Sequence, residues 1–324
     1  MAQLRAISWM NLLLVLTTLA ALLQTVTGAS GNQCSAARTQ RAVDTTTPRI
    51  IVPLYIYPLP NAWDKLYTAI RANPAAAFTV IINPNSGPGS GNAPDSDYTE
   101  AIKKLRATPA PGQILELVGY VATGYGKTLA KNVKADVTKY SRWPTAVRPD
   151  GIFFDETDTA SKYLDQYAKY TDFVKSLNWT TTSTTSSKQC NSKSLVQRSG
   201  ITILNPGTWP QDARFWSTSS DHIIVYEDKL ANFDLADYQR KTSNNKQASA
   251  FQRSYIFYNV NPNNATTKDG SKFANLDALV NATVNRLSAR GGLFVTNLDI
   301  ASTDVYASFS SIWPDFVRAM ANIS

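Results

Sequence analysis

Eight short runs of apolar, β-branched and aromatic residues recur between residues 50 and 298 of this 324-residue chain, and they constrain the fold more than any other feature. Between the runs lie amphipathic stretches with apolar residues at helical spacing, as in Trp63-Leu66-Tyr67-Ile70. The runs are continuously apolar rather than alternating, which is typical of strands buried on both faces. They occupy residues 50–58, 78–83, 114–121, 151–156, 200–205, 222–227, 253–260 and 292–298.

Eight buried strands, each followed by a helix in about 250 residues, predict an α/β fold that closes into a single (β/α)8 barrel. An open, doubly wound sheet is the alternative. We place the barrel at residues 49–324. A Ser/Thr-rich insertion at 178–194 interrupts it between the fourth helix and the fifth strand, and we interpret it as a surface loop.

The first 29 residues resemble a secretory signal peptide. Arg5 is their only charged residue, and Met10 to Leu23 form a 14-residue apolar segment that is short for a bilayer span. Small residues follow at Gly28 and Ala29, where we expect cleavage; an uncleaved anchor is the alternative. Residues 30–48 are a polar leader, and we expect no stable membrane anchor.

Features typical of extracellular proteins follow the signal. Four N-x-[ST] sequons are candidate glycosylation sites, at Asn178, Asn264, Asn281 and Asn322. Cys34 and Cys190 are the only cysteines, and an oxidising compartment favours one disulfide between them, although two separate thiols remain possible. We expect a secreted protein, extracellular or associated with the cell wall.

Several partner classes are disfavoured by the sequence. The net charge is +8, but the basic residues are scattered, so we expect no nucleic-acid partner. The segment TGYGKT at 123–128 resembles a phosphate-binding loop, yet Val121 stands where that motif needs its first glycine, so we expect no nucleotide. The only histidine is His222, which argues against a His-rich zinc site and is interpreted as structural. We expect a monomer with no metal and no cofactor.

Polar residues stand at the carboxyl ends of the predicted strands, where barrels of this type carry their active sites. Amides, carboxylates and phenols dominate, a set suited to sugar hydroxyls and to the apolar faces of sugar rings. The residues are Tyr57, Asn83, Asn85, Tyr120, Asp155, Glu156, Asn205, Glu227, Tyr258, Asn259 and Asn297.

Three of these residues are carboxylates that directly follow apolar runs, and burial of such groups is costly unless they are paired or used. Glycoside hydrolysis needs two carboxyl groups, and Asp155 and Glu227 lie two strands apart on the predicted rim. Glu156 is adjacent to Asp155 and points the other way. The alternatives are acids that form salt bridges or cap helices, and a cation site at Asp155-Glu156.

Six motifs in order resemble the spherulin-4-like family of secreted proteins, and they cover most of residues 50–300. They are VPLYIYPLPNAW (52–63), VIINPNSGPG (80–89), LVGYVATGYG (117–126), GIFFDE (151–156), NPGTWP (205–210) and IIVYED (223–228). The resemblance implies a (β/α)8-barrel glycoside hydrolase, an endo-α-1,4-N-acetylgalactosaminidase acting on galactosaminogalactan, an extracellular amino-sugar polysaccharide of fungal walls and biofilms.

Carried over to this sequence, the resemblance implies that Asp155 is the nucleophile or stabilising carboxylate and Glu227 the general acid/base. Glu156 would be essential but auxiliary, and Tyr57, Asn83, Tyr120 and Asn205 would line the sugar cleft. The 178–194 insertion is longer than in the family pattern, and we expect it to reshape one wall of the cleft. The basic net charge favours a neutral, N-acetylated sugar.

The alternative function is a non-catalytic glycan-binding protein of the wall or matrix on the same barrel, because fold alone does not define activity. Retention of all three carboxylates favours the hydrolase, since a lectin-like protein has no need of them.

Overall fold

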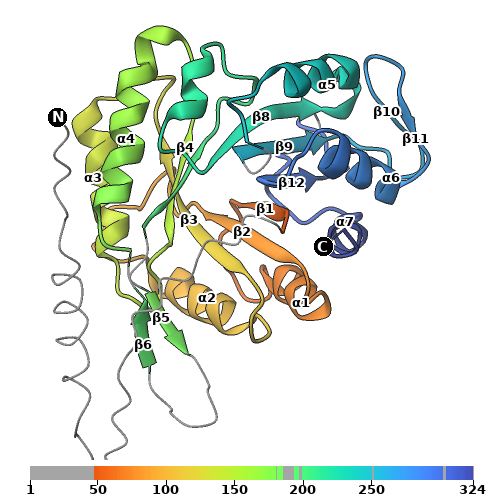
Figure 1. Ribbon diagram of the computed structural model, residues 1–324. Helices are drawn as coiled ribbons and strands as arrows, with labels where there is room; N and C mark the ends of the chain where they lie inside the picture. The colour runs from red at the N-terminus through yellow and green to blue at the C-terminus, as the bar shows by residue number, and fades with distance from the viewer. Residues whose placement is uncertain are drawn as a thin grey trace, which may run out of the picture. The chain divides into compact units, whose positions relative to one another are not determined.

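Every apolar run of the sequence forms one strand of a closed, parallel eight-stranded barrel in the computed structural model (Figure 1). The structure describes residues 47–179, 181–184, 193–196, 199–249, 252–301 and 304–323. The strands are β1 (Arg49–Leu54), β2 (Ala77–Ile82), β3 (Leu115–Ala122), β4 (Gly151–Asp155), β7 (Ile201–Leu204), β8 (His222–Lys229), β9 (Arg253–Tyr258) and β12 (Gly292–Val295). Their order around the barrel is β1-β12-β9-β8-β7-β4-β3-β2. The (β/α)8 prediction is confirmed, and the open sheet is wrong because β1 pairs with β12.

Helices connect most of these strands, and their buried residues are those with helical spacing in the sequence. They are α1 (Asp64–Ala72), α2 (Ser96–Ala107), α3 (Ala130–Arg142), α4 (Leu164–Ser176), α5 (Leu235–Asn244), α6 (Leu276–Asn281) and α7 (Trp313–Ala321). Aspartate side chains cap the amino ends of two of these helices. Asp95 accepts from Tyr98 N at the start of α2, and Asp234 accepts from Asp237 N at the start of α5. Such caps satisfy backbone donors that have no partner inside the helix.

The connection after β7 differs from the expected strand-helix alternation. It carries only a five-residue 3-10 helix, Ala213–Ser217. The preceding segment contains Pro206, Gly207 and Pro210, which disfavour an α-helix. The chain therefore runs from β7 to β8 through a loop, and this loop borders the candidate site.

The barrel strands are buried on both faces, as the continuous apolar runs predicted. All six residues of β1 and all six of β2 are buried. Aromatic side chains fill the layer between strands and helices, and Trp63 and Trp143 are almost completely buried there. A buried ion pair joins Arg49 to Glu116 at 3.3 Å, and Thr79 donates to the same carboxylate at 2.8 Å.

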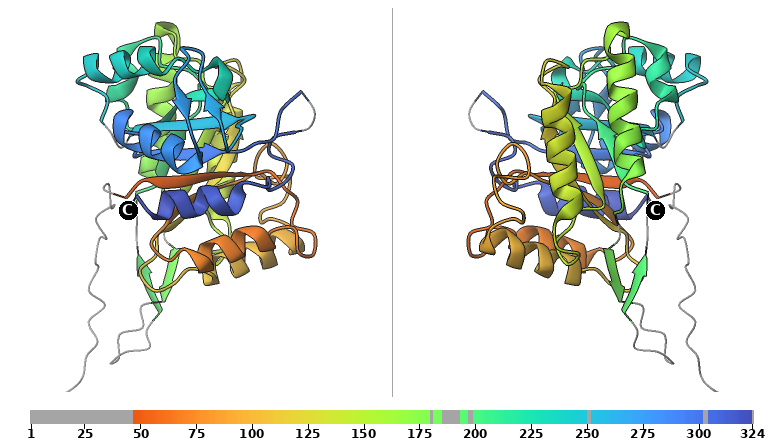
Figure 2. Two further views of the ribbon diagram at one scale, coloured as in Figure 1. Left: turned by 90° about the vertical axis from the view of Figure 1, so that its right-hand side faces the viewer. Right: turned by 90° about the vertical axis from the view of Figure 1, so that its left-hand side faces the viewer.

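The 178–194 insertion overlaps an antiparallel pair, β5 (Thr181–Thr184) with β6 (Lys193–Val196), which ends two residues beyond it. Because it joins the end of α4 to the start of β7, it lies at the amino ends of the strands. Figure 2 shows the hairpin on the side where β1 begins, opposite the loops that follow β1 and β12. The described strands of this hairpin therefore do not form a wall of the cleft, contrary to the expectation from the sequence. A second short pair, β10 (Ala265–Thr266) with β11 (Lys272–Phe273), follows β9.

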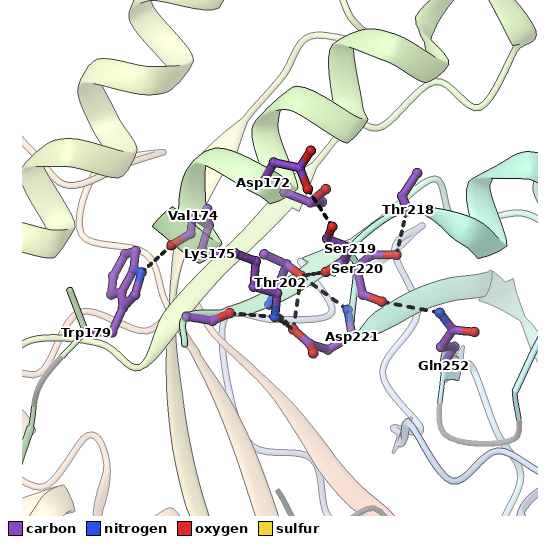
Figure 3. A network of polar contacts seen from close by, with 12 residues as sticks. Asp172, Val174, Lys175, Trp179, Thr202, Thr218, Ser219, Ser220, Asp221 and Gln252 are labelled. Atoms are coloured by element: carbon purple, nitrogen blue, oxygen red, sulfur yellow. Dashed lines mark hydrogen bonds and ion pairs between the residues drawn. The ribbon is translucent and has the colours of Figure 1, made fainter. Parts of the chain in front are cut away.

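A polar network holds the amino end of β7 between α4 and β8 (Figure 3). Asp221 is its centre: Oδ2 accepts from Lys175 Nζ at 2.5 Å, from Thr202 N at 2.7 Å and from Thr202 Oγ1 at 3.0 Å. Lys175 also donates to Gly200 O at 2.8 Å, so the end of α4 is bound to the start of β7. At the edge of the network, Asp172 accepts one hydrogen bond from exposed Ser219.

We expect Asp221→Ala to destabilise the protein by about 2 kcal/mol, because it removes three hydrogen bonds to one carboxylate and leaves the buried Thr202 N–H without that acceptor. The melting temperature should fall by roughly 4–8 °C. Asp172→Ala is the matched control and should change stability by less than about 0.5 kcal/mol. Thermal denaturation followed by circular dichroism compares them, and equal melting temperatures would contradict the assignment.

Some sequence predictions fall outside the described residues: the signal peptide, most of the polar leader, and the Cys34–Cys190 disulfide. In the ranges that the structure does describe, none of the helices has the length and apolar character needed to cross a bilayer. The four sequon asparagines, Asn178, Asn264, Asn281 and Asn322, are all exposed.

Candidate active site

Two carboxylates and an amide meet at the carboxyl ends of three neighbouring strands. Asn205 Nδ2 donates to Asp155 Oδ1 at 2.8 Å and to Glu227 Oε2 at 2.7 Å. Both oxygens contact one nitrogen, so they lie no further apart than the sum of the two distances, ~5.5 Å. The structure thus brings together three of the residues selected from the sequence.

The order of the strands explains this meeting. Asp155 is the last residue of β4, Asn205 follows the last residue of β7, and β7 lies between β4 and β8. Glu227 lies on β8 beyond an irregularity between Ile224 and Tyr226, where the register with β9 shifts by one residue. Such bulges re-aim side chains and are common beside active sites. β8 continues to Lys229, two residues beyond the predicted end.

The orientation of the Asn205 amide follows from a backbone contact. Gly207 N donates to Asn205 Oδ1 at 3.0 Å, so Nδ2 must face the carboxylates. Gly207 O accepts from Glu227 N at 3.0 Å. Gly207 has φ +63°, and a Cβ there would lie 3.5 Å from Glu227 Cβ. The positive φ is the reason for glycine here, since a Cβ at this distance would make only ordinary contact with the glutamate.

Three tyrosines surround the carboxylates. Tyr306, on the loop between β12 and α7, donates its hydroxyl to Glu227 Oε1 in a very short contact. Its ring packs edge-on against Tyr55 at 5.2 Å, and Tyr55 packs against Tyr120 at 5.5 Å. The carboxylates therefore lie beside tyrosine rings and hydroxyl groups, and such groups are suited to binding sugars.

The surroundings of Glu227 change its acidity. Burial and the nearby charge of Asp155 raise its pKa above the usual value, while hydrogen bonds from Tyr306 and Asn205 oppose the rise. Burial and the charges of Asp155 and Glu227 raise the pKa of Tyr55, and burial and Asp155 also raise that of Tyr120. These tyrosines therefore stay neutral and can act as hydrogen-bond donors.

Glu156 faces a different partner from Asp155. Its Oε2 accepts from Gly124 N at 3.1 Å, and its own N–H donates to Asp155 Oδ1 at 2.9 Å. The residue has φ +53°, an uncommon conformation for a side chain of this kind. Glu156 lies beyond the last residue of β4, so its separate partner follows from the turn after the strand and not from the strand alternation that the sequence suggested. Within the described ranges, no cluster of three or more potential ligands of a metal ion occurs.

The other residues selected from the sequence lie around this centre with partners of their own. Tyr57 is 43% exposed and donates to Asp95 and Asp97. Asn83 Oδ1 accepts from Gly87 N within its own turn, and Asn85 is exposed.

The residues selected from the last two strands also have partners of their own. Tyr258 donates to Asp228 at 2.9 Å, and Asn297 donates to Ser311. Asn259 donates to Asp299. Burial and the charges of Asp228 and Glu227 raise the pKa of Tyr258 to about 12.

Sequence reasoning did not select Tyr55 and Tyr306. The predicted first strand ran to residue 58, so Tyr57 was taken as its end, whereas β1 ends at Leu54 and Tyr55 follows it. A first strand that ended at residue 54 would have placed Tyr55 at the rim. Tyr306 lies well beyond β12 in a connecting loop, and no local pattern indicates it.

The glycine-bearing segment at 123–128 forms a turn after β3. Gly126 N donates to Thr123 O, and Thr128 N donates to the same oxygen. His222 is the first residue of β8, at the end of the strand opposite the carboxylates.

The protein is a (β/α)8-barrel protein with a pair of carboxylates, bridged by one amide, at the carboxyl ends of its strands. Within that class, residues 49–320 match the sequence profile of spherulation-specific family 4. The chain belongs to this family.

The chain is also similar, to different degrees, to individual proteins. Spherulin-4 of Physarum polycephalum is 31% identical over 252 residues, which is 77% of this chain and 63% of that relative's length. The crystal structure of Aspergillus clavatus Sph3 in complex with GalNAc is 31% identical, with a TM-score of 0.66 over 85% of this chain and 98% of Sph3. An endo-beta-N-acetylglucosaminidase from Cordyceps militaris is 10% identical, with a TM-score of 0.49 over 86% of this chain and 90% of its own.

Proposed function

We propose that this protein is an endo-acting glycoside hydrolase that cleaves α-1,4-linked, N-acetylgalactosamine-containing polysaccharide of the galactosaminogalactan type. The observation that carries the proposal is the Asp155–Asn205–Glu227 bridge at the carboxyl ends of β4, β7 and β8. The likeness to Sph3, whose crystal structure contains GalNAc, supports the choice of sugar.

The separation of the two carboxylates supports a mechanism with retention of anomeric configuration. Retaining glycosidases hold their carboxyl groups about 5–5.5 Å apart, and inverting enzymes leave about 6.5–9.5 Å for a water molecule. No more than ~5.5 Å separates Asp155 Oδ1 from Glu227 Oε2, the two oxygens that share Asn205 Nδ2, and this limit on one pair of oxygens favours the first arrangement. In an α-linked 2-acetamido galactoside the acetamido group lies on the same face as the leaving group. It cannot attack from behind, so a protein carboxylate supplies the nucleophile.

Asp155 and Glu227 take complementary roles in this scheme. Glu227, with its raised pKa, carries a proton and gives it to the glycosidic oxygen as the bond to C1 breaks. Asp155 attacks C1 and forms a covalent glycosyl ester. Glu227, now a carboxylate, then takes a proton from water, which attacks C1 and releases Asp155.

Glu156 positions the nucleophile. Its backbone N–H donates to Asp155 Oδ1, and its side chain is held by Gly124 N on the loop after β3. The positive φ of Glu156 is the kind of local strain that persists where surrounding contacts hold it and often marks functional sites.

The surrounding residues supply substrate binding. Tyr55 and Tyr120 present aromatic rings beside the carboxylates. We assign Tyr57, Asn83, Asn85, Tyr258 and Asn297 to outer parts of the same rim. An endo-acting enzyme needs such an extended surface, because it holds sugar units on both sides of the bond that it cleaves.

We also propose that the protein is secreted and acts outside the cell. The signal-like first 29 residues support this, as do the four exposed sequon asparagines. Mass spectrometry of the protein from a eukaryotic host would detect glycans at Asn178, Asn264, Asn281 or Asn322.

We expect the secreted protein to release N-acetylgalactosamine oligomers from galactosaminogalactan, with α configuration at the newly formed reducing ends. Mass spectrometry identifies the oligomers, and proton NMR during the first minutes reports the anomer before mutarotation. A β anomer would overturn the retaining mechanism. Binding to the polymer without any release would replace the hydrolase with a non-catalytic glycan-binding protein.

A further inference from the structure

Each oxygen of the Glu227 carboxyl group has its own hydrogen-bond partner, and the two partners come from different parts of the barrel. Oε2 accepts from Asn205, just beyond β7, and Oε1 accepts from Tyr306, on the loop between β12 and α7. These two partners differ in what they can do with a proton.

Asn205 can only donate through Nδ2, and its orientation is fixed because Gly207 N occupies Oδ1. Glu227 Oε2 therefore cannot carry a proton directed at Asn205. The same holds for Asp155 Oδ1, which accepts both from Asn205 and from Glu156 N. Neither Glu227 Oε2 nor Asp155 Oδ1 can therefore donate a proton to the groups that contact it.

A tyrosine hydroxyl, in contrast, can donate or accept. When Glu227 is protonated, its proton can lie on Oε1 and point to the Tyr306 oxygen. When Glu227 is ionised, the hydroxyl turns and donates to Oε1. Of these two partners, Tyr306 is the one that suits both protonation states.

The Tyr306 ring is held in place for this task. It packs against Tyr55 at 5.2 Å and against Phe294 at 6.1 Å, and its backbone N–H donates to Asp304 at 2.9 Å. The hydroxyl therefore reaches Glu227 from a supported ring.

We propose that Tyr306 is a positioning residue for Glu227, holding the proton of the acid form at Oε1 and donating to the same oxygen once that proton has left. The inference rests on the proposed function, because it takes Glu227 as the acid. When substrate binds, the proton on Oε1 turns from the Tyr306 oxygen toward the leaving-group oxygen, and it passes to that oxygen as the bond to C1 breaks. The Tyr306 hydroxyl and the Asn205 amide then both stabilise the carboxylate that remains.

The groups that face Glu227 determine how its pKa responds. Burial and the charge of Asp155 on β4 raise this pKa, and Tyr306 and Asn205 lower it by donating hydrogen bonds to the ionised form. Tyr55, Tyr120 and Tyr258 are also close enough to sense the charge of Glu227. Loss of the Tyr306 hydroxyl removes one donor to the carboxylate, so the pKa of Glu227 rises further.

Tyr306→Phe tests this inference, because it removes the hydroxyl and keeps the ring. A general acid works in its protonated form, so activity falls as pH rises through the Glu227 pKa. We expect the alkaline limb of the kcat profile to move to higher pH and kcat at the optimum to fall about tenfold or more. Tyr67→Phe is the matched control, since it removes a hydrogen bond to Ala101 O in the helix layer. It should leave the pH profile unchanged.

A second readout does not depend on activity. The chain has only four glutamates, Glu100, Glu116, Glu156 and Glu227, so carbon-13 labelling of glutamate gives four carboxyl signals, which Glu227→Gln assigns. The Glu227 signal should titrate at higher pH in Tyr306→Phe than in the wild type or in Tyr67→Phe. An unchanged titration in a variant with wild-type melting temperature would overturn the role of Tyr306. Absence of hydrolysis by the wild type would instead overturn the proposed function.

Discussion

Glu227→Gln and Asp155→Asn are each expected to lower kcat on the polysaccharide by at least about a thousandfold, because one removes the acid and the other the nucleophile. Both replacements keep the size of the side chain. The amides can still occupy the place of the carboxyl groups beside Asn205, so folding should be preserved and the melting temperatures should stay close to that of the wild type.

An activated substrate separates the two roles. An aryl glycoside with a good leaving group needs no protonation, so Glu227→Gln should form the covalent intermediate with Asp155 at a rate near that of the wild type. Asp155→Asn should remain inactive, since it lacks the attacking oxygen. Pre-steady-state release of the aryl alcohol measures this step.

Glu100→Gln is the matched control for the glutamate. Its side chain is 74% exposed and pairs only with Lys103 on α2, so activity should not change. Retention of more than about a tenth of wild-type activity by Glu227→Gln on the natural polymer would rule out Glu227 as the general acid.

Gly151→Ala is expected to have the largest effect on stability, with a loss of about 4 kcal/mol in the free energy of unfolding. Gly151 begins β4, and a Cβ there would lie 2.0 Å from Ile201 O and 2.4 Å from Ile201 N. Both atoms belong to the backbone of β7, so neither can rotate away. The two strands must separate, which breaks the barrel beside the Asp221 network.

Gly270→Ala is the matched control for Gly151→Ala. Gly270 has φ +81°, but no atom lies within 4 Å of its added Cβ, so only backbone strain of about 1–2 kcal/mol remains. Thermal denaturation should show a drop of roughly 10 °C or more for Gly151→Ala and a clearly smaller one for Gly270→Ala. Equal drops would show that β4 and β7 can move apart at little cost.

Much of the barrel could be predicted because its signals are local. A strand buried on both faces needs a continuous apolar run, and each of the eight runs supplied one. Helical spacing likewise marked the buried face of α4 at Tyr167, Tyr170 and Val174. The exception is the segment after β7, where helix-breaking residues give a loop with a 3-10 helix.

The carboxylates could also be selected from the sequence, for a similar reason. Asp155 and Glu227 follow apolar runs, and parallel strands of a barrel all end on the same face. The net charge and the polar insertion were poorer guides. The charge says nothing about the local field at Glu227, where Asp155 is the main charged neighbour. The insertion was expected at the cleft, although its place between the fourth helix and the fifth strand of a (β/α)8 barrel already assigns it to the opposite face, where helices lead into strands.

Residue type and periodicity are enough to predict the number of strands, the parallel barrel and the acidic residues at its rim. Which of these groups meet depends on the folded chain. Closure of the barrel brings Tyr306 to Glu227 across 79 residues and Asn205 to Asp155 across 50. Such contacts depend on strand order, on the bulge in β8 and on the path of a loop, and none of these leaves a pattern in neighbouring residues.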